Sequence, residues 1–244
     1  MRRLSDIVCI FLIQLKSMRA EIGPFLLAGL VFPSAMYLFA TAVSRNEAAS
    51  EQLRFLAGSI VFSLSLTSIS WLGYLLLENR FTGRLKLFAT VPLSPSSYVC
   101  GFLVFAFVQA AIGTTALLMI GRFLGVQMRP SLLPLAVVIV LTVLCLCGLG
   151  AVIAARARSF TQGSLLTDAL GAGLIFLAPV YYPAELMPRG LRTVAEFLPT
   201  TFAARGVESA LEGRHQISAQ VIVLALMAIA TLSLGFGMTK WREN

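Results

Sequence analysis

The chain has 244 residues, of which 58% are hydrophobic and only 12% are charged, and its mean hydropathy is +0.87. Soluble globular domains carry about a quarter charged residues, so this composition excludes an ordinary soluble protein and indicates an integral membrane protein. The net charge of +8 does not indicate nucleic-acid binding, because the chain has no soluble basic patch with interleaved aromatic residues. We therefore expect one all-α membrane domain over residues 1–244, in contact with lipid, with Lys and Arg at the ends of its helices.

Residues 1–22 are the first expected element. Apolar residues recur there at helical spacing along one stripe: Leu4, Ile7, Val8, Phe11, Leu12, Leu15 and Met18. Polar residues lie largely opposite: Arg3, Asp6, Gln14 and Ser17. The pattern predicts an amphipathic helix in the inner membrane interface, with a continuation of the first span as the alternative. A signal peptide is not favoured, because no small-residue cleavage site precedes the next apolar stretch.

Six apolar stretches of about 20 residues follow, each long enough to cross a hydrocarbon core of about 30 Å. They are Gly23–Val43, Phe55–Leu77, Tyr98–Ile120, Leu132–Ala154, Gly163–Tyr182 and Ile217–Met238. Pro33 and Pro179 lie within two of them and are expected to cause kinks. Six crossings place both termini on one side, and eleven of the 19 Lys and Arg residues then lie on that side. This excess favours cytoplasmic termini.

A basic segment with aromatic residues, 78–97, separates the second and third stretches. Its character comes from Arg80, Phe81, Arg84, Leu85, Phe88 and Pro92. Phe81, Leu85 and Phe88 have the spacing of one side of a short helix, which the proline ends. Two interpretations remain open: an anchor in the lipid interface, or a rigid element that docks into a groove on a partner protein.

The last outer connection, residues 179–215, has the pattern of two short helices. Pro188 starts the first and Pro199 ends it, while the second runs from about Thr201 to Leu211 with Gly213 as its stop. Both helices are too short to span a bilayer and too apolar to lie free in water. We expect these half-helices, within 184–215, to dip into the outer membrane face with protein around them.

Polar residues at membrane depth are the next candidates, because they are costly there unless they serve a purpose. Asp168, inside the fifth stretch, either pairs with Arg156 or Arg158 or lines a substrate path. Gln109 and the hydroxyl residues of the second and third stretches either line such a path or make contacts between helices.

Cysteine and histidine residues do not indicate a chemical site. The spacing of Cys145 and Cys147 fits neither a metal site nor a disulfide framework, and these residues are predicted to pack, as are Gly148 and Gly150. The only histidine, His215, has no second ligand at metal-binding spacing and is expected to be a solvated loop residue. We therefore expect no catalytic, cofactor-binding or metal-binding residue.

The inner segment contains Glu78, Gly83, Leu85 and Pro92-Leu93-Ser94, and the outer connection contains Tyr181-Tyr182-Pro183 and Leu198-Pro199-Thr200. In their order and spacing these motifs and the predicted helices resemble the permease subunits of type-2 ATP-binding-cassette (ABC) exporters. The family's Gly-Thr-Leu and following acidic residue are replaced here by Thr82-Gly83 and basic neighbours. This departure leaves the docking register open.

The resemblance implies that segment 78–97 contains a coupling helix seated on a separate ABC ATPase subunit. The implied coupling residues are Glu78, Arg80, Phe81, Gly83, Arg84, Leu85, Phe88, Pro92, Arg156 and Arg158. The implied outer gate consists of Tyr181, Tyr182, Pro183, Phe197 and Pro199. The chain contains no G-x-x-x-x-G-K-[ST] motif, so ATP and Mg²⁺ are expected on the partner.

The resemblance further implies a second permease copy or a homologous permease, a bacterial plasma membrane, and export of a lipid, drug or glycan-like substrate. Two alternatives remain from the residues themselves. A proton- or ion-driven carrier would depend on Asp168, and a membrane-embedded enzyme would need converging acid, base or metal ligands.

Overall fold

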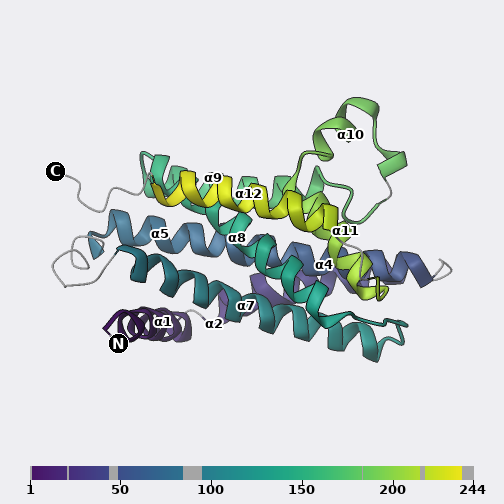
Figure 1. Cartoon of the computed structure of the whole chain (residues 1–244), viewed down its shortest axis with the longest axis horizontal. Helices are drawn as coiled ribbons and strands as arrows, with labels where there is room; N and C mark the ends of the chain where they lie inside the picture. The colour runs from purple at the N-terminus through teal and green to yellow at the C-terminus, as the bar shows by residue number, and fades with distance from the viewer. Residues whose placement is uncertain are drawn as a thin grey trace.

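The computed structural model describes residues 2–20, 22–43, 49–84, 95–182, 184–214 and 218–237. Every regular element within these residues is helical, as the composition predicts. In chain order the helices are α1 (Arg2–Ala20), α2 (Ile22–Leu26), the π-helix η1 (Leu27–Val31), α3 (Phe32–Val43), α4 (Ala49–Ser65), the π-helix η2 (Leu66–Trp71), α5 (Leu72–Phe81), α7 (Pro95–Phe123), α8 (Leu132–Arg156), α9 (Phe160–Phe176), the 3-10 helix η3 (Ala184–Leu186), α10 (Arg189–Ala195), α11 (Pro199–Leu211) and α12 (Ser218–Gly237). Figure 1 shows the long helices side by side along the longest axis of the molecule.

The described residues of the six predicted apolar stretches lie mainly on helices, although the fifth stretch continues past the end of α9. Four segments of the described chain are long and apolar enough to cross a membrane: Glu51–Phe81, Ser97–Phe123, Leu132–Arg156 and Ser218–Gly235. The segment from α2 to α3 contains a shorter apolar helix, Gly29–Val43, and α9 has 17 residues. The fold is therefore that of a membrane protein with several apolar helices.

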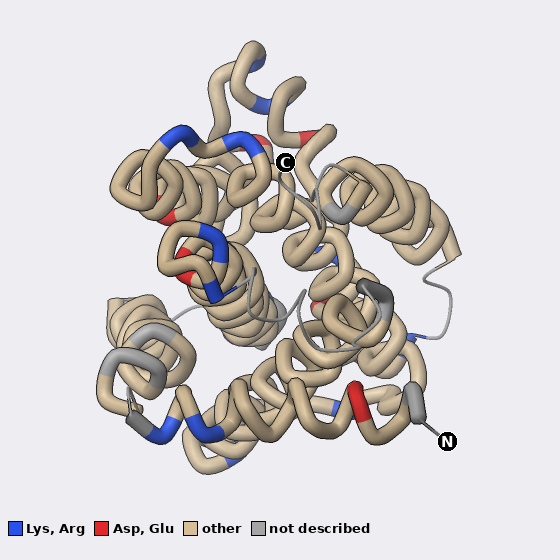
Figure 2. Tube along the Cα trace, turned by 90° about the vertical axis from the view of Figure 1, so that its left-hand side faces the viewer, with Lys and Arg blue, Asp and Glu red and all other residues tan. Residues whose placement is uncertain are grey.

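Helix α1 runs across the long axis of the bundle rather than continuing into α2 (Figures 1 and 2). Its rotation is set by contact with α7, where Ile10 is fully buried over Gly101 and the Phe11 and Phe105 rings lie 6.4 Å apart. Gln14 lies on this packed side and is only 4% exposed. The prediction that Gln14 belongs to a polar outer face is therefore wrong, because packing on α7 decides which face of α1 is covered.

The closest helix contact joins α8 and α12. A Cβ atom on Gly148 would lie 2.6 Å from the backbone carbonyl carbon of Thr231, and one on Gly235 would lie 2.6 Å from the carbonyl oxygen of Gly148. The Thr231 hydroxyl donates a hydrogen bond to the carbonyl oxygen of Cys145 at 3.1 Å. Small residues thus let two backbones meet, as is usual for helices in lipid. The predicted packing role of Gly148 is confirmed, and Cys145 and Cys147 are both buried and free of disulfides.

The helical run α4–η2–α5 lies at the centre of the bundle, and 78% of its most apolar 18-residue stretch is buried. The Ser63 hydroxyl donates to the carbonyl oxygen of Gly29 at 2.6 Å. Pro33, four residues after Gly29, has no N–H to donate to that carbonyl, so the hydroxyl replaces the missing helical bond. The Ser63 hydroxyl therefore makes a contact between helices, one of the two roles predicted for the hydroxyl residues, and it explains how proline is accommodated in η1–α3.

The two short helices of the last connection behave differently. Helix α11 packs between α4, α8 and α12, and eight of its residues are buried. Helix α10 projects sideways from the bundle and buries only Ala195 (Figure 1). Pro199 is the first residue of α11, where a proline costs no hydrogen bond, and Gly213 ends the helix region with a φ of 79°. Both short helices were expected to be surrounded by protein, and this is true of α11 but not of α10.

Pro179 does not kink a helix. Helix α9 ends at Phe176, so the proline lies in the turn that follows, and the predicted extension of the fifth stretch to Tyr182 is too long. The Tyr182 hydroxyl donates to the carbonyl oxygen of Phe176 at 2.8 Å, which satisfies a carbonyl group at the end of that helix.

Candidate functional site

One end of the bundle holds those predicted coupling residues that the structure describes: Glu78, Arg80, Phe81, Gly83, Arg84, Arg156 and Arg158. It contains α1, the end of α5, the start of α7, the α8–α9 connection and the end of α12, and we call it the inner end after the predicted orientation (Figure 1). Figure 2 views the molecule from this side, with its Lys and Arg residues in blue. The opposite end, which holds α10, α11 and Phe123, is called the outer end.

Helix α5 ends before the predicted coupling helix could begin. Both the backbone N–H and the hydroxyl of Thr82 donate to the carbonyl oxygen of Glu78, at 2.9 and 2.6 Å. Gly83 follows with a φ of 76°, a left-handed conformation that closes helices and that glycine adopts without strain. Phe81 therefore belongs to the last turn of α5, and the prediction of one continuous helix from Phe81 to Phe88 is wrong at its first residue.

Three of the predicted coupling residues, Leu85, Phe88 and Pro92, lie outside the described residues. The neighbouring side chains that the structure does describe differ in exposure. Phe81 is 41% exposed, and the Arg84 side chain is half exposed while pairing with Glu78 at 3.0 Å.

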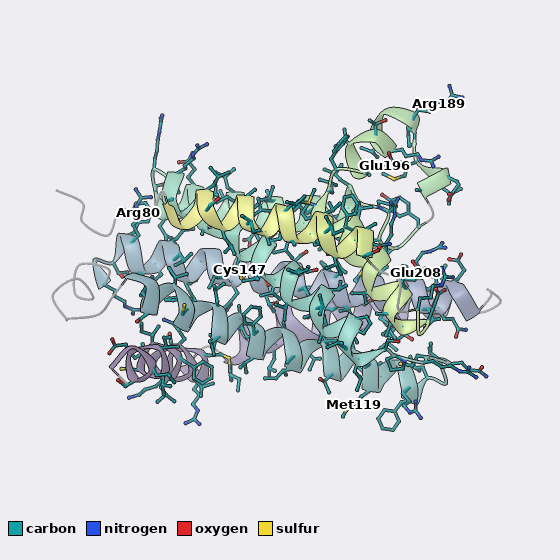
Figure 3. All side chains as sticks on the ribbon, viewed as in Figure 1. Arg80, Met119, Cys147, Arg189, Glu196 and Glu208 are labelled. Atoms are coloured by element: carbon teal, nitrogen blue, oxygen red, sulfur yellow. The ribbon has the colours of Figure 1, made fainter. Side chains whose placement is uncertain are left out.

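Arg80 points inward and joins α5 to the end of α8 (Figure 3). One guanidinium nitrogen, Nη1, donates to the carbonyl oxygens of Ala154, Ala155 and Ala157 at 2.8, 3.1 and 3.0 Å. These carbonyls belong to the last turn of α8 and the residue after it, where no helical N–H is available. A positive charge also interacts favourably with the negative end of the helix dipole. We call this set of contacts the Arg80 clamp.

The α8–α9 connection is itself ordered by hydrogen bonds. The Ser159 hydroxyl accepts from the Gln162 backbone N–H at 3.2 Å, and the Gln162 side-chain oxygen accepts from the Arg158 N–H at 3.1 Å. This reciprocal arrangement resembles a capping box and fixes the start of α9. The side chains of Arg156 and Arg158 remain exposed beside it.

The Arg80 clamp and the hydrogen bonds of Ser159 and Gln162 together join the end of α5 to the α8–α9 connection. Arg80 connects the end of α5 to the end of α8 and to Ala157 in the α8–α9 connection. The Tyr74 and Phe160 rings, 5.1 Å apart, connect α5 to α9. Asn79 donates to the Tyr98 hydroxyl at 3.2 Å and ties α5 to the start of α7 as well. A force applied near Phe81 would therefore reach α7, α8 and α9 directly.

The predicted outer-gate residues that the structure describes differ in their contacts and exposure. The Tyr181 hydroxyl donates to the Ser59 hydroxyl of α4 at 3.3 Å, and the missing side chain of Gly58 leaves room for the backbone at Val180. Phe197 is 73% exposed, and Pro183 lies outside the described residues. The structure thus holds Tyr181 on α4 and leaves Phe197 on the surface.

The two intramembrane polar candidates lie apart from each other. Gln109 of α7 is 4% exposed, and its side-chain nitrogen has no hydrogen-bond partner among the described residues. Asp168 is exposed on α9 and makes no ion pair with Arg156, Arg158 or any other described residue. The predicted pairing of Asp168 with an inner-loop arginine is therefore not present. His215 lies outside the described residues.

Comparison with known protein families shows to which family the chain belongs. The family model for the ABC-2 type transporter matches residues 11–211, which is most of the chain. The chain belongs to the ABC-2 type transporter family. Comparison with curated proteins gives no match.

As an ABC-2 type transporter, the chain is a membrane component of an ABC transporter and not the catalytic subunit. The family implies an ABC ATPase as a general partner. The resemblance seen in the sequence is confirmed, and the family membership favours a transporter subunit over an ion-driven carrier or a membrane enzyme.

The Arg80 clamp is the feature of this ABC-2 transporter that sequence reasoning missed. The sequence places Arg80 in a basic segment that includes the expected coupling residues, whereas its side chain caps the end of α8, 74 residues away in sequence. The local sequence contains no signal for this contact, because a capping arginine and the carbonyls it satisfies lie on different helices. Ser159 and Gln162, by contrast, have the spacing of a capping box and were recognisable.

Proposed function

We propose that this chain is the membrane-spanning half of an ATP-driven exporter in a bacterial plasma membrane, with six crossings and both termini in the cytoplasm. Two ATPase subunits bind at the inner end, and two permease halves enclose the substrate path. The segment after Phe81 acts as the coupling element, and Arg156 and Arg158 add a second contact. ATP-driven closure of the ATPase pair shifts the helix bundle between two packed states.

The Arg80 clamp carries this proposal. The coupling segment can transmit force only if it is rigidly joined to the helices that move. Arg80 supplies that connection at its three carbonyl contacts, and the Asn79–Tyr98 bond adds a connection to α7. Movement of the coupling segment would therefore displace α5, α7, α8 and α9 together.

The exposed face of α9 supports a second permease half. Asp168 lies on this face with the exposed Leu165 and Leu166, within an apolar helix. A carboxylate facing lipid at this depth is costly, so a protein surface or a polar substrate path is the more favourable neighbour. We propose that α9 faces the path or the second half of the permease, whose substrate is a lipid, drug or glycan-like molecule.

Copurification and ATPase measurements test the proposal. The tagged full-length chain, purified from its native membrane, should bring down an ABC ATPase at one subunit per permease. Phe81→Ala should weaken ATPase binding about tenfold or more if the phenylalanine is a central contact. Val194→Ala removes a comparably exposed apolar side chain at the outer end and is the matched control, expected to leave ATPase binding unchanged.

Two results would contradict the proposal. Transport by the chain alone in liposomes under an imposed ion gradient, without an ATPase, would favour a carrier. Turnover of a substrate without ATP or a gradient, abolished in an Asp168→Asn variant, would favour an enzyme. Equal loss of ATPase binding in Phe81→Ala and Val194→Ala would show that Phe81 has no particular role in docking.

A further inference from the structure

A cavity of about 830 Å³ opens at the outer end, between the α7–α8 connection and the end of α11. It lies far along the bundle from the coupling site and contains none of the predicted gate residues. Its apolar part is formed by the buried Leu53, Val126 and Leu211. Its charged lining consists of Arg122, Arg129, Arg214 and Glu212.

The charges in this cavity are not balanced. Glu212 is engaged by Arg214 at 2.8 Å. Two nearby carboxylates outside the lining, those of Glu51 and Glu208, lie 3.0 and 3.7 Å from Arg54. Arg122 and Arg129 have no ion pair or side-chain hydrogen bond with any described residue, so two arginines of the cavity lining lack a carboxylate partner there.

The walls of the cavity are held in place by backbone contacts. The backbone N–H groups of Arg129 and Ser131 donate to the carbonyl oxygens of Leu211 and Ala210 at 3.0 and 2.9 Å, which fixes the α7–α8 connection to the end of α11. Gly213 has a φ of 79°, and a Cβ atom there would lie 3.0 Å from the carbonyl oxygen of Arg129. The α7–α8 connection and the turn after α11 therefore pack closely, and the backbone of these two segments shapes the cavity.

The surroundings of the cavity are those of a membrane interface. Helix α7 has 29 residues and is about 43 Å long, whereas the hydrocarbon core is about 30 Å thick, so Arg122 near its end lies at the level of the headgroups. Large apolar side chains near the cavity are exposed: Phe123 is 90% exposed and Leu132 is 73% exposed. Met119 is 59% exposed on the side of α7 that faces away from the bundle (Figure 3). Guanidinium groups beside exposed apolar side chains match a molecule that is anionic at one end and apolar at the other.

We propose that this cavity binds the phosphate-bearing headgroup of an anionic membrane lipid. Arg122 and Arg129 hold the phosphate oxygens, because a guanidinium donates two parallel hydrogen bonds to such an anion. Phe123 and Leu132 contact the acyl chains. That the bound lipid belongs to the outer leaflet rests on the orientation in the proposed function, but the binding itself does not.

Titration of the purified full-length chain in a nonionic detergent tests the assignment. The probes are dihexanoyl phosphatidylglycerol, dihexanoyl phosphatidylcholine and inorganic phosphate, and bound molecules are counted by native mass spectrometry. The chain should bind phosphatidylglycerol more tightly than the other two probes. The double variant Arg122→Gln/Arg129→Gln should lose about tenfold or more in affinity for phosphatidylglycerol, since charged hydrogen bonds are lost.

A matched control removes two other arginines from the same end. Arg189 and Arg205 are exposed and do not line the cavity. Arg189→Gln/Arg205→Gln should change the affinity by no more than about twofold, since exposed charges outside a site contribute little. Unchanged binding in Arg122→Gln/Arg129→Gln, with a melting temperature equal to that of the parent, would overturn the proposal. An equal loss in both double variants would also overturn it, because the effect would then be one of net charge.

A second variant separates a lipid from a free anion. Phe123→Ser should weaken phosphatidylglycerol binding and leave inorganic phosphate binding unchanged. If inorganic phosphate binds the parent as tightly as phosphatidylglycerol does, a free anion and not a lipid is the ligand, and the lipid assignment fails. None of these measurements uses an ATPase, so failure here and failure of the ATPase coupling can be told apart.

Discussion

Replacing Arg80 by alanine removes the hydrogen bonds that connect α5 to the end of α8. The substitution leaves the carbonyl oxygens of Ala154, Ala155 and Ala157 without the hydrogen bonds that the guanidinium donates. Each hydrogen bond to a charged donor contributes about 1.5–3 kcal/mol, but the three share one nitrogen and are not additive. We expect a loss of about 3 kcal/mol in the free energy of unfolding.

The assay is thermal unfolding of the purified chain in detergent, followed by tryptophan fluorescence. For a chain of this size 1 kcal/mol corresponds to about 2–4 °C, so Arg80→Ala should lower the melting temperature by about 6–12 °C. Arg80→Lys should recover only part of this loss, because a single ammonium does not reproduce the planar guanidinium.

Arg84→Gln is the matched control, since it breaks the exposed pair with Glu78 and should cost less than about 1 kcal/mol. The reasoning is refuted if Arg80→Ala melts within error of Arg84→Gln. It is also refuted, for the functional part, if Arg80→Ala retains full stimulation of the partner ATPase, because the clamp is the proposed route of the force.

Two further predictions concern packing and pH. Gly148→Ala should destabilise the bundle by about 1–3 kcal/mol, because the new methyl group meets the α12 backbone at Thr231. Gly173→Ala on α9 is the control: its methyl group meets no atom within 4 Å, so the variant should be neutral or slightly stabilised. Equal melting temperatures for the two variants would contradict the contact between Gly148 and α12. At the outer end, burial raises the pKa of the Glu208 carboxyl above its usual 4.5, although Arg54 nearby acts in the opposite direction. The folded chain therefore retains a proton that the unfolded chain has lost, so the free energy of unfolding should fall as pH rises from 4.5 through the raised pKa. Glu208→Gln should remove this slope from melting curves recorded across that range, and an identical slope in parent and variant would rule out Glu208 as its source.

The helical segments and their approximate ends were predictable from the sequence because hydrophobic length and helix-stopping residues act locally. Gly213 is an example, because it adopts the left-handed backbone conformation expected where a helix stops. Pro199 lies at a helix boundary, but it is the first residue of α11 and does not end the preceding helix as predicted, since α10 stops at Ala195. Gly83 acts by the same local rule as Gly213 and ends α5 between Phe81 and Leu85, although the spacing of Phe81, Leu85 and Phe88 taken alone predicts one continuous helix.

Other features were not predictable because they depend on which helices meet. The rotation of α1 follows from the fit of Ile10 over Gly101, so the sequence of α1 alone placed Gln14 on the wrong side. The Arg80 clamp and the unbalanced arginines of the outer cavity likewise require two segments distant in sequence to come together. Periodicity within one helix contains no information about such contacts.

The π-helical segment η2 separates α4 from α5 within one continuous run of helix. In a loop, one added or deleted residue is absorbed by a change in path, but in a helix it turns everything beyond it by about 100°. A single deletion in the α-helical stretch between Leu72 and Asn79 would therefore rotate Arg80 relative to α4 and separate the guanidinium from its carbonyls. Within η2 the i→i+5 turns hold one residue more than α-helical turns, so a deletion between Leu66 and Trp71 can be absorbed by a return to α-helix. The number of residues between Leu72 and Arg80 therefore matters as much as their identity, whereas η2 is the place where this helical run tolerates a change in length.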